Sequence, residues 1–248
     1  CIRASCLDTW GRRASVGAGA MALSTLKGQD WQTLWLKAVL FQDTLVGRDK
    51  CMRFAQYCAR CLSGLIDSSV AQQVLVNLAM ARKALRFGRQ VRWAHDMREV
   101  YLNERDPFNL VTTLLEMGSF LVYCCIDHAC FAQRVNLLPL GPKKTDLLDR
   151  FAEVFWVTEV VPALMREVRA YFNGGGAKEN SQAWIDRRAR AKLLIFKLLC
   201  DLPCSYYFVQ PLAWRNKRVH KAWCGALGAA ASAVSIQMTW PRSVSLEK

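Results

Sequence analysis

A run of 19 residues without a charged side chain, Ala222–Trp240, limits most strongly what this chain can fold into. As a helix this run would measure about 28 Å, which is close to the hydrocarbon thickness of a bilayer. Trp223 and Trp240 stand at its two ends, where interfacial aromatic side chains are expected. The run therefore predicts a C-terminal transmembrane helix, with a buried core helix of a soluble bundle as the alternative.

Small residues in this run and a second apolar run elsewhere in the chain also bear on the prediction of a membrane helix. Small residues in the uncharged run form small-xxx-small patterns, which suit close contact between helices in lipid. These residues are Gly225, Gly228, Ala229, Ser232 and Ala233. A second apolar run, Leu110–Ile126, is a weaker membrane candidate, because Glu116 would need a partner or a wet face there.

The net positive charge of the chain indicates which classes of binding partner are favoured. The chain of 248 residues carries 34 Lys and Arg against 20 Asp and Glu, a net charge of +14, and yet 52% of it is hydrophobic. Such an apolar content excludes a disordered basic tail. A basic but apolar chain favours an anionic partner, either nucleic acid or the surface of a membrane. Eleven cysteines, an odd number that includes the neighbours Cys124 and Cys125, indicate reduced thiols rather than a disulfide framework.

The apolar residues recur at helical spacing and show no alternating strand pattern, which predicts an all-α fold, a helical membrane protein with amphipathic helices. Gly47 marks an expected break in the first helix, and Pro162 an expected kink in the fourth. Besides the apolar run at 110–126, the expected helices are Asp30–Ile66, Ser69 to about Leu102, Thr145–Phe172, Gln182–Cys204 and Lys221–Trp240.

The sequence divides the chain into four regions. Residues 1–20 lack an initiator Met, whereas Met21 opens a natural start, so we expect an upstream translation product or a leader outside the fold. Residues 21–172 are expected to form an amphipathic helical region. The Gly-rich segment 173–181 predicts a linker, and residues 182–248 a helical hairpin that ends in the membrane helix.

The clearest amphipathic pattern extends from Val76 to Val91. At about 100° per residue, apolar side chains collect on one face and basic side chains on the other. The apolar residues are Val76, Met80, Ala84, Leu85, Phe87 and Val91, and the basic residues are Arg82, Lys83, Arg86 and Arg89. Such a helix can lie in a bilayer interface, with its apolar face among acyl chains and its cations on anionic lipid phosphates. The alternative is an ordinary bundle helix with a solvated basic side.

Motifs for catalysis, metals and cofactors are not found. Cys58 and Cys61 form a C-x-x-C inside a helical run, without a second pair. Cys124, Cys125 and His128 could supply only three zinc ligands, whereas a structural zinc site uses four. We therefore expect no enzyme activity, no cofactor and no metal.

Short motifs along the chain carry a family resemblance. Their residues are Gly47, Arg48, Asp49, Gln56 and Tyr57 in the segments GRDK and RFAQY, Tyr123 and Asp127 in VYCCID, and Asp201 in CDL. Together with ARKALRFG at residues 81–88, these motifs occur in the same order from about Leu45 to Arg242. In this respect the chain resembles the peroxin-11 family of peroxisomal membrane biogenesis factors.

The resemblance implies a protein of the peroxisomal membrane, or of a specialised peroxisome such as the glycosome, with both termini in the cytosol. It also implies elongation, proliferation and fission of the organelle through amphipathic-helix insertion. Self-association into a homo-oligomer, membrane fission machinery and a peroxisomal import receptor are implied as partners. A membrane channel for small metabolites is an alternative, which would use Glu116 and Asp127 near the bilayer. A soluble basic helical protein that binds nucleic acid is a second alternative, although no recognisable nucleic-acid-binding motif is present.

Overall fold

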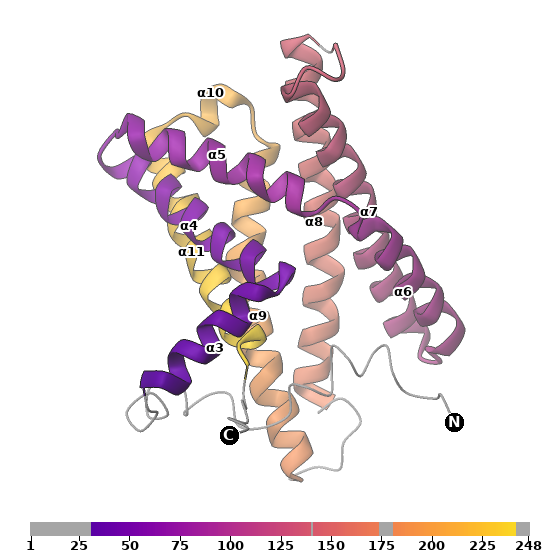
Figure 1. The fold of residues 1–248 in the computed structure, drawn as a ribbon. Coiled ribbons are helices and arrows are strands. Elements are labelled where there is room, and N and C mark those ends of the chain that lie inside the picture. The colour runs from indigo at the N-terminus through magenta and orange to yellow at the C-terminus, as the bar shows by residue number, and fades with distance from the viewer. Residues whose placement is uncertain (1–30, 140, 174–180, 242–248) are drawn as a thin grey trace.

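The computed structural model describes residues 31–139, 141–173 and 181–241. The described residues form α-helices joined by short turns and contain no strand, which confirms the all-α prediction (Figure 1). The predicted leader and residues 174–180 of the predicted linker lie outside the described residues. The helices are α3 (Trp31–Asp43), α4 (Leu45–Leu65), α5 (Ser69–Leu85), α6 (Arg89–Asn103), α7 (Pro107–Arg134), α8 (Pro142–Asn173), α9 (Gln182–Val209), α10 (Leu212–Arg215) and α11 (Arg218–Thr239).

Side-chain caps set where several helices begin. A side-chain oxygen that accepts a hydrogen bond from a backbone N–H of the first turn satisfies one of the unpaired donors there. The residues that act in this way are Thr44 before α4, Ser68 before α5, Asp106 before α7 and Ser181 before α9. Pro107 follows Asp106 as the first residue of α7, a position where its missing N–H is harmless.

Two glycines determine how the N-terminal helices are divided. The break predicted at Gly47 lies earlier, at Thr44, and Gly47 is in the first turn of α4. A Cβ at Gly47 would lie 1.8 Å from the carbonyl oxygen of Phe41, so only glycine permits this approach. Gly88 has a φ of +79°, in the left-handed region that favours glycine, and it separates α5 from α6. The helix predicted to continue to about Leu102 is therefore two helices.

The helices pack as two groups joined by α9 and, in part, by α5 (Figure 1). On one side α4 packs along α11, and on the other α7 and α8 form a long hairpin with α6 beside α7. Helix α9 lies between α8 and α11, and α5 runs across the bundle from α4 towards α7. Residues far apart in sequence thus surround a common interior.

The small residues of α11 pack inside the chain. A Cβ at Gly225 would lie 2.2 Å from the backbone nitrogen of Cys61, and one at Gly228 would lie 2.1 Å from the ring of Tyr57. Ser232 is fully buried, whereas Ala229 is half-buried and Ala233 is exposed. The face with the two glycines and Ser232 therefore provides the close contact between α11 and α4.

Among the described residues, the helix that is long and apolar enough to cross a membrane is α7 and not the C-terminal helix. The prediction of a membrane helix at 222–240 is wrong in this respect, because Ala, Gly and Ser dominate α11 and carry less hydropathy than the Leu, Val, Phe and Ile of α7. Only 22% of the apolar window of α7 is buried. Its Glu116 has a partner, since one of its carboxylate oxygens lies 2.5 Å from Nη1 of Arg166.

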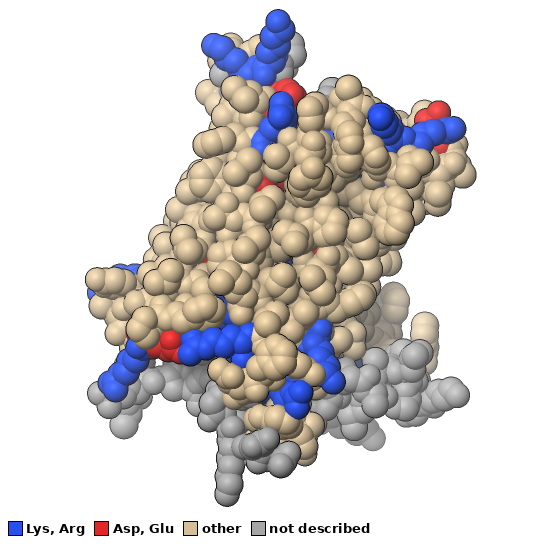
Figure 2. Space-filling model, turned by 180° about the vertical axis from the view of Figure 1, so that it is seen from behind, with Lys and Arg blue, Asp and Glu red and all other residues tan. Residues whose placement is uncertain are grey.

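The interior holds many polar side chains beside apolar ones, whereas large apolar side chains fill the interior of a soluble helical bundle. The largest of the fully buried side chains are Asp201, Cys124, Cys130, Cys204, Ser205 and Ser232. By contrast, large apolar side chains are exposed on α3, α5, α7, α8 and α9. Figure 2 shows one face of the molecule, with an uncharged band across the middle and Lys and Arg gathered towards the upper and lower ends. This arrangement is typical of a helical bundle that sits in lipid.

Candidate functional site

A cavity of about 2570 Å³ occupies the interior, and residues from every helix from α3 to α11 contribute to its lining. The lining includes 15 Lys or Arg side chains and nine Asp or Glu side chains. Charged groups rarely leave water unless they are paired or serve a function. The cavity is therefore the candidate functional site.

The basic side chains of the predicted amphipathic stretch lie in this interior. Arg82 and Arg86 are each 8% exposed, and Lys83 and Arg89 are partly buried. Arg82, Arg86 and Arg89 recur at the spacing i, i+4 and i+7, so they follow one stripe of the chain. We call these four residues the basic cluster.

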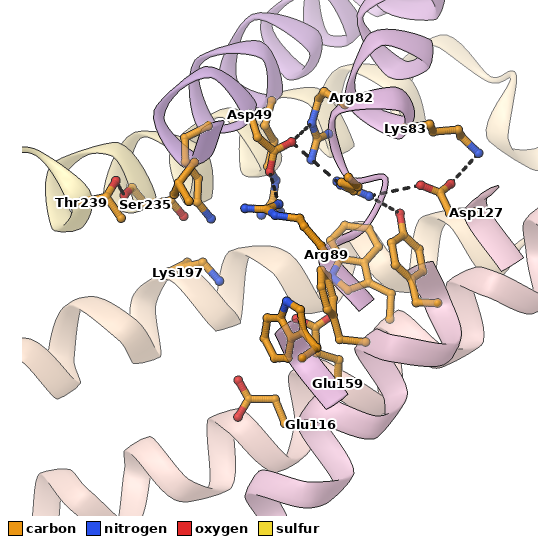
Figure 3. A pocket seen from close by; sticks show the side chains of 18 of the residues that line it. Asp49, Arg82, Lys83, Arg89, Glu116, Asp127, Glu159, Lys197, Ser235 and Thr239 are labelled. Carbon is orange, nitrogen blue, oxygen red and sulfur yellow. Dashed lines mark hydrogen bonds and ion pairs between the residues drawn. The ribbon is translucent and has the colours of Figure 1, made fainter. Parts of the chain in front are cut away.

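Asp49 on α4 binds one side of the basic cluster (Figure 3). Nε of Arg82 lies 3.0 Å from Oδ1 of Asp49, and Nη1 of Arg82 donates a hydrogen bond of 2.6 Å to Oε1 of Gln56. Nη1 of Arg89 lies 3.3 Å from Oδ2 of Asp49. Nε of Arg86 lies at 3.9 Å from the same carboxylate. One buried carboxylate is thus shared by three guanidinium groups.

Asp127 on α7 binds the other side of the basic cluster (Figure 3). Nη1 of Arg86 donates to Oη of Tyr123 at 3.2 Å and to Oδ2 of Asp127 at 3.3 Å. Nζ of Lys83 lies 2.5 Å from Oδ1 of Asp127 and 3.4 Å from Asp149 on α8. Burial alone would lower the pKa of the Lys83 ammonium, but the carboxylates of Asp127 and Asp149 raise it above its ordinary value. Lys83 therefore stays charged inside the protein.

The apolar side chains of the same stretch lie mostly on the outside. Phe87 is 69% exposed and Val91 is 78% exposed. Val76 and Ala84 are also exposed, whereas Met80 and Leu85 are half-buried. This orientation differs from the expectation that the basic face meets water or lipid phosphates. The reason is that the carboxylates that bind the cations come from other helices, and the periodicity of one helix does not reveal them.

The family-motif residues include the partners of the basic cluster. Asp49, Gln56, Tyr123 and Asp127 contact Arg82 or Arg86, although the sequence presented them as separate motifs. The other motif residues are structural: Gly47 and Arg48 hold the junction of α3 and α4, and Tyr57 packs on α11. Sequence reasoning missed that these motifs form one network. Their charged residues within otherwise apolar helices were the signal that could have revealed it.

A second set of cations meets at Asp201 on α9. Asp201 is 1% exposed, and its two oxygens lie 2.5 Å from Nη2 of Arg53 and 3.0 Å from Nζ of Lys197. The guanidinium of Arg53 also lies over the rings of Tyr57 and Trp156, at 5.6 and 5.7 Å from their centroids. This cluster links α4 to α9, and the sequence analysis had singled out only Asp201 and Tyr57 among its members.

Carboxyl groups line the opposite wall of the cavity. Glu116 on α7 and Glu153 and Glu159 on α8 belong to the lining. Figure 3 shows Glu116 and Glu159 together on one side and Lys197 on the other. The cavity therefore has a predominantly basic wall, formed by α4, α5 and α9, and a wall with several acidic groups.

The weak zinc candidates of the sequence do not converge. Cys124 is buried and Cys125 is exposed, so the two thiols face different surroundings. The ring of His128 packs against Phe87, with centroids 4.5 Å apart. No group of three His, Cys, Asp or Glu suited to a metal ion occurs among residues 31–139, 141–173 and 181–241.

Comparison with known proteins gives two matches. A family model described as Peroxisomal biogenesis factor 11 (PEX11) matches residues 36–240. A curated relative from Saccharomyces cerevisiae, Peroxisomal membrane protein PMP27, is 25% identical over 133 residues, which is 53% of this chain and 56% of that protein. The match thus spans little more than half the length of the relative. No solved structure matches the chain.

Proposed function

The chain belongs to the peroxisomal biogenesis factor 11 family, and from this we propose that it remodels the peroxisomal membrane by placing its uncharged outer surface in the lipid. The family is one of biogenesis factors involved in peroxisome proliferation, and its description is not that of an enzyme. The yeast relative is named a peroxisomal membrane protein, which supports a location at that membrane.

The observation that carries the proposal is the outer face of α5. The exposed side chains of α5 are uncharged, and they include Val70, which is 68% exposed, and Val74, which is 42% exposed. The cations of α5 form ion pairs inside the protein. The neighbouring helix α6 exposes Arg92 and Arg98, whose side chains are each 70% accessible. An uncharged face beside exposed cations suits a position at the boundary between acyl chains and anionic headgroups.

The mechanism follows from this position. A helix that inserts at headgroup depth expands the leaflet that it enters and favours positive curvature of that leaflet. Copies that self-associate would concentrate the expanded patches and elongate the organelle. We also propose, from membership of the family, that both termini face the cytosol and that an import receptor and the membrane fission machinery are partners.

Tubulation of anionic liposomes by the full chain tests the proposal. The double variant Val74→Glu and Phe87→Glu places two carboxylates on the exposed apolar surface, where each costs up to about 2.5–3.5 kcal/mol at full lipid depth. We expect this variant to bind liposomes weakly and to form no tubules. The matched control, Asn103→Glu with Asn173→Glu, adds the same charge at exposed polar positions and should tubulate normally. Unchanged tubulation by the first variant would contradict the proposal.

A channel for small metabolites is a second candidate, and the charged cavity favours it. Both Glu116 and Asp127, which the sequence analysis assigned to such a channel, line this cavity. A polar interior inside an apolar exterior is the arrangement by which membrane proteins hold a water-filled path. Planar-bilayer recordings of the purified chain test this candidate, since the absence of conductance steps would exclude it.

The soluble nucleic-acid-binding alternative is not favoured by the geometry. It would require the basic cluster on the outside, where guanidinium groups could meet a phosphate backbone. Arg82 and Arg86 are instead buried among carboxylates and Tyr123. Membership of the peroxisomal family argues in the same direction.

A further inference from the structure

We infer that the basic wall of the cavity binds an oxyanion of the phosphate type, held by Lys50, Arg53 and Lys197 between α4 and α9. The inference concerns the interior of the protein, and it does not depend on whether the outer surface bends membranes.

The charge of the cavity lining is the first argument. Its 15 cationic side chains exceed its nine carboxyl side chains by six. Carboxylates behind the lining pair with some of these cations, as Asp201 does with Arg53 and Lys197 and Asp146 does with Arg215. Where several buried cations share one carboxylate, the cost of their desolvation is only partly offset. A bound anion would relieve this excess.

The excess of positive charge is most concentrated around Lys50. This residue lines the cavity, and its charged neighbours are Lys197, Arg53, Asp49 and Asp201. Asp201 already binds both Arg53 and Lys197. Asp49 is likewise occupied by guanidinium groups of the basic cluster. Lys50 therefore shares both neighbouring carboxylates with other cations, and neither carboxylate serves Lys50 alone.

The number and kind of these groups indicate the ligand. Lys50, Arg53 and Lys197 carry three positive charges, whereas Asp201 is shared among them and Asp49 is shared with the basic cluster, so an anion would balance the remaining positive charge. Phosphate offers several acceptor oxygens to an Arg fork and to Lys ammonium groups, and these side chains are its usual ligands in proteins. The cavity of about 2570 Å³ is much larger than one phosphate group. The anion can thus be the end group of a water-soluble solute or the headgroup of a lipid.

Titration of the purified full-length chain distinguishes these two sources. Inorganic pyrophosphate is titrated into the protein in detergent micelles by calorimetry, and phosphatidic acid is tested by co-purification in phosphatidylcholine nanodiscs. Lys50→Gln removes one charge-assisted contact, so we expect it to weaken binding at least about tenfold. Lys50→Arg should retain binding. The control Lys144→Gln removes the same charge from an exposed position outside the cavity and should bind as the wild type does.

Each outcome has a defined meaning. Binding of pyrophosphate that depends on Lys50 supports the site with a soluble solute as its ligand. Enrichment of phosphatidic acid alone, lost in Lys50→Gln, supports the site with a lipid headgroup as its ligand. If neither probe binds, or if Lys50→Gln and Lys144→Gln behave alike, the inference is overturned. Circular dichroism of each variant verifies that the fold is retained, and liposome tubulation is scored separately.

Discussion

Asn in place of Asp127 would remove the counter-charge of two buried cations with almost no change of shape. Asp127 is 4% exposed, and its carboxylate lies 2.5 Å from Nζ of Lys83 and 3.3 Å from Nη1 of Arg86. Removal of one partner from a buried ion pair costs about 3–5 kcal/mol, because the remaining charge stays desolvated. Lys83 retains Asp149 at 3.4 Å and Arg86 retains Asp49 at 3.9 Å, so we expect Asp127→Asn to lower the free energy of unfolding by the lower end of this range, about 3 kcal/mol.

Unfolding in mixed detergent micelles, followed by the helical circular dichroism signal, measures this change. Asp96→Asn is the matched control, because Asp96 lies 3.8 Å from the exposed Arg92 and its side chain is 24% accessible. A pair of this kind contributes at most about 1 kcal/mol. The double variant Asp127→Asn with Lys83→Gln also removes one of the two cations that bind Asp127. It should therefore recover part of the lost free energy of unfolding. If Asp127→Asn were no more destabilising than Asp96→Asn, the reasoning would be refuted.

Other predictions concern glycines, together with the liposome and anion-binding experiments described above. Gly88→Ala should destabilise the protein by about 1 kcal/mol, because φ is +79° there, and Gly88→Asn should cost less; equal denaturation midpoints would contradict this. Gly228→Ala should cost about 1–3 kcal/mol, since its Cβ would lie 2.1 Å from the ring of Tyr57. Gly118→Ala, whose Cβ would meet only Met97 at 3.6 Å, is the control for the same unfolding measurement, and a loss as large as that of Gly228→Ala would argue against the packing explanation.

The helices were largely predictable because their signals are local. Apolar periodicity located most of the helices. Gly88 was not recognised as a break, since a glycine within a helical pattern can either continue the helix at a cost or end it. The sequence made the segment within α7 only a weaker membrane candidate than α11, because it did not reveal that Arg166 is the partner of Glu116.

The site was only half predictable, and the reason is physical. Helical periodicity identified Arg82, Lys83, Arg86 and Arg89 as one face of a helix. It could not show whether this face points to the interior or to the outside, because that depends on where the partners of the cations lie. Those partners come from α4, α7 and α8, and contacts between distant segments leave no periodicity in the sequence. A carboxylate in an apolar stretch, such as Asp127, is the feature that demands a cation elsewhere in the chain.

The pairing of charges across long sequence distances has a consequence for how the protein is made. The pair of Arg53 and Asp201 can form only after Asp201, 148 positions later, has been synthesised. The pair of Arg86 and Asp127 likewise requires a residue 41 positions later. A nascent chain that has emerged only as far as α5 would carry Arg53, Lys83 and Arg86 before Asp201 and Asp127 have been synthesised, and such a segment is costly to place in hydrocarbon. Helix-by-helix insertion during synthesis is therefore disfavoured. The charges can enter the bilayer together, once translation has passed α9.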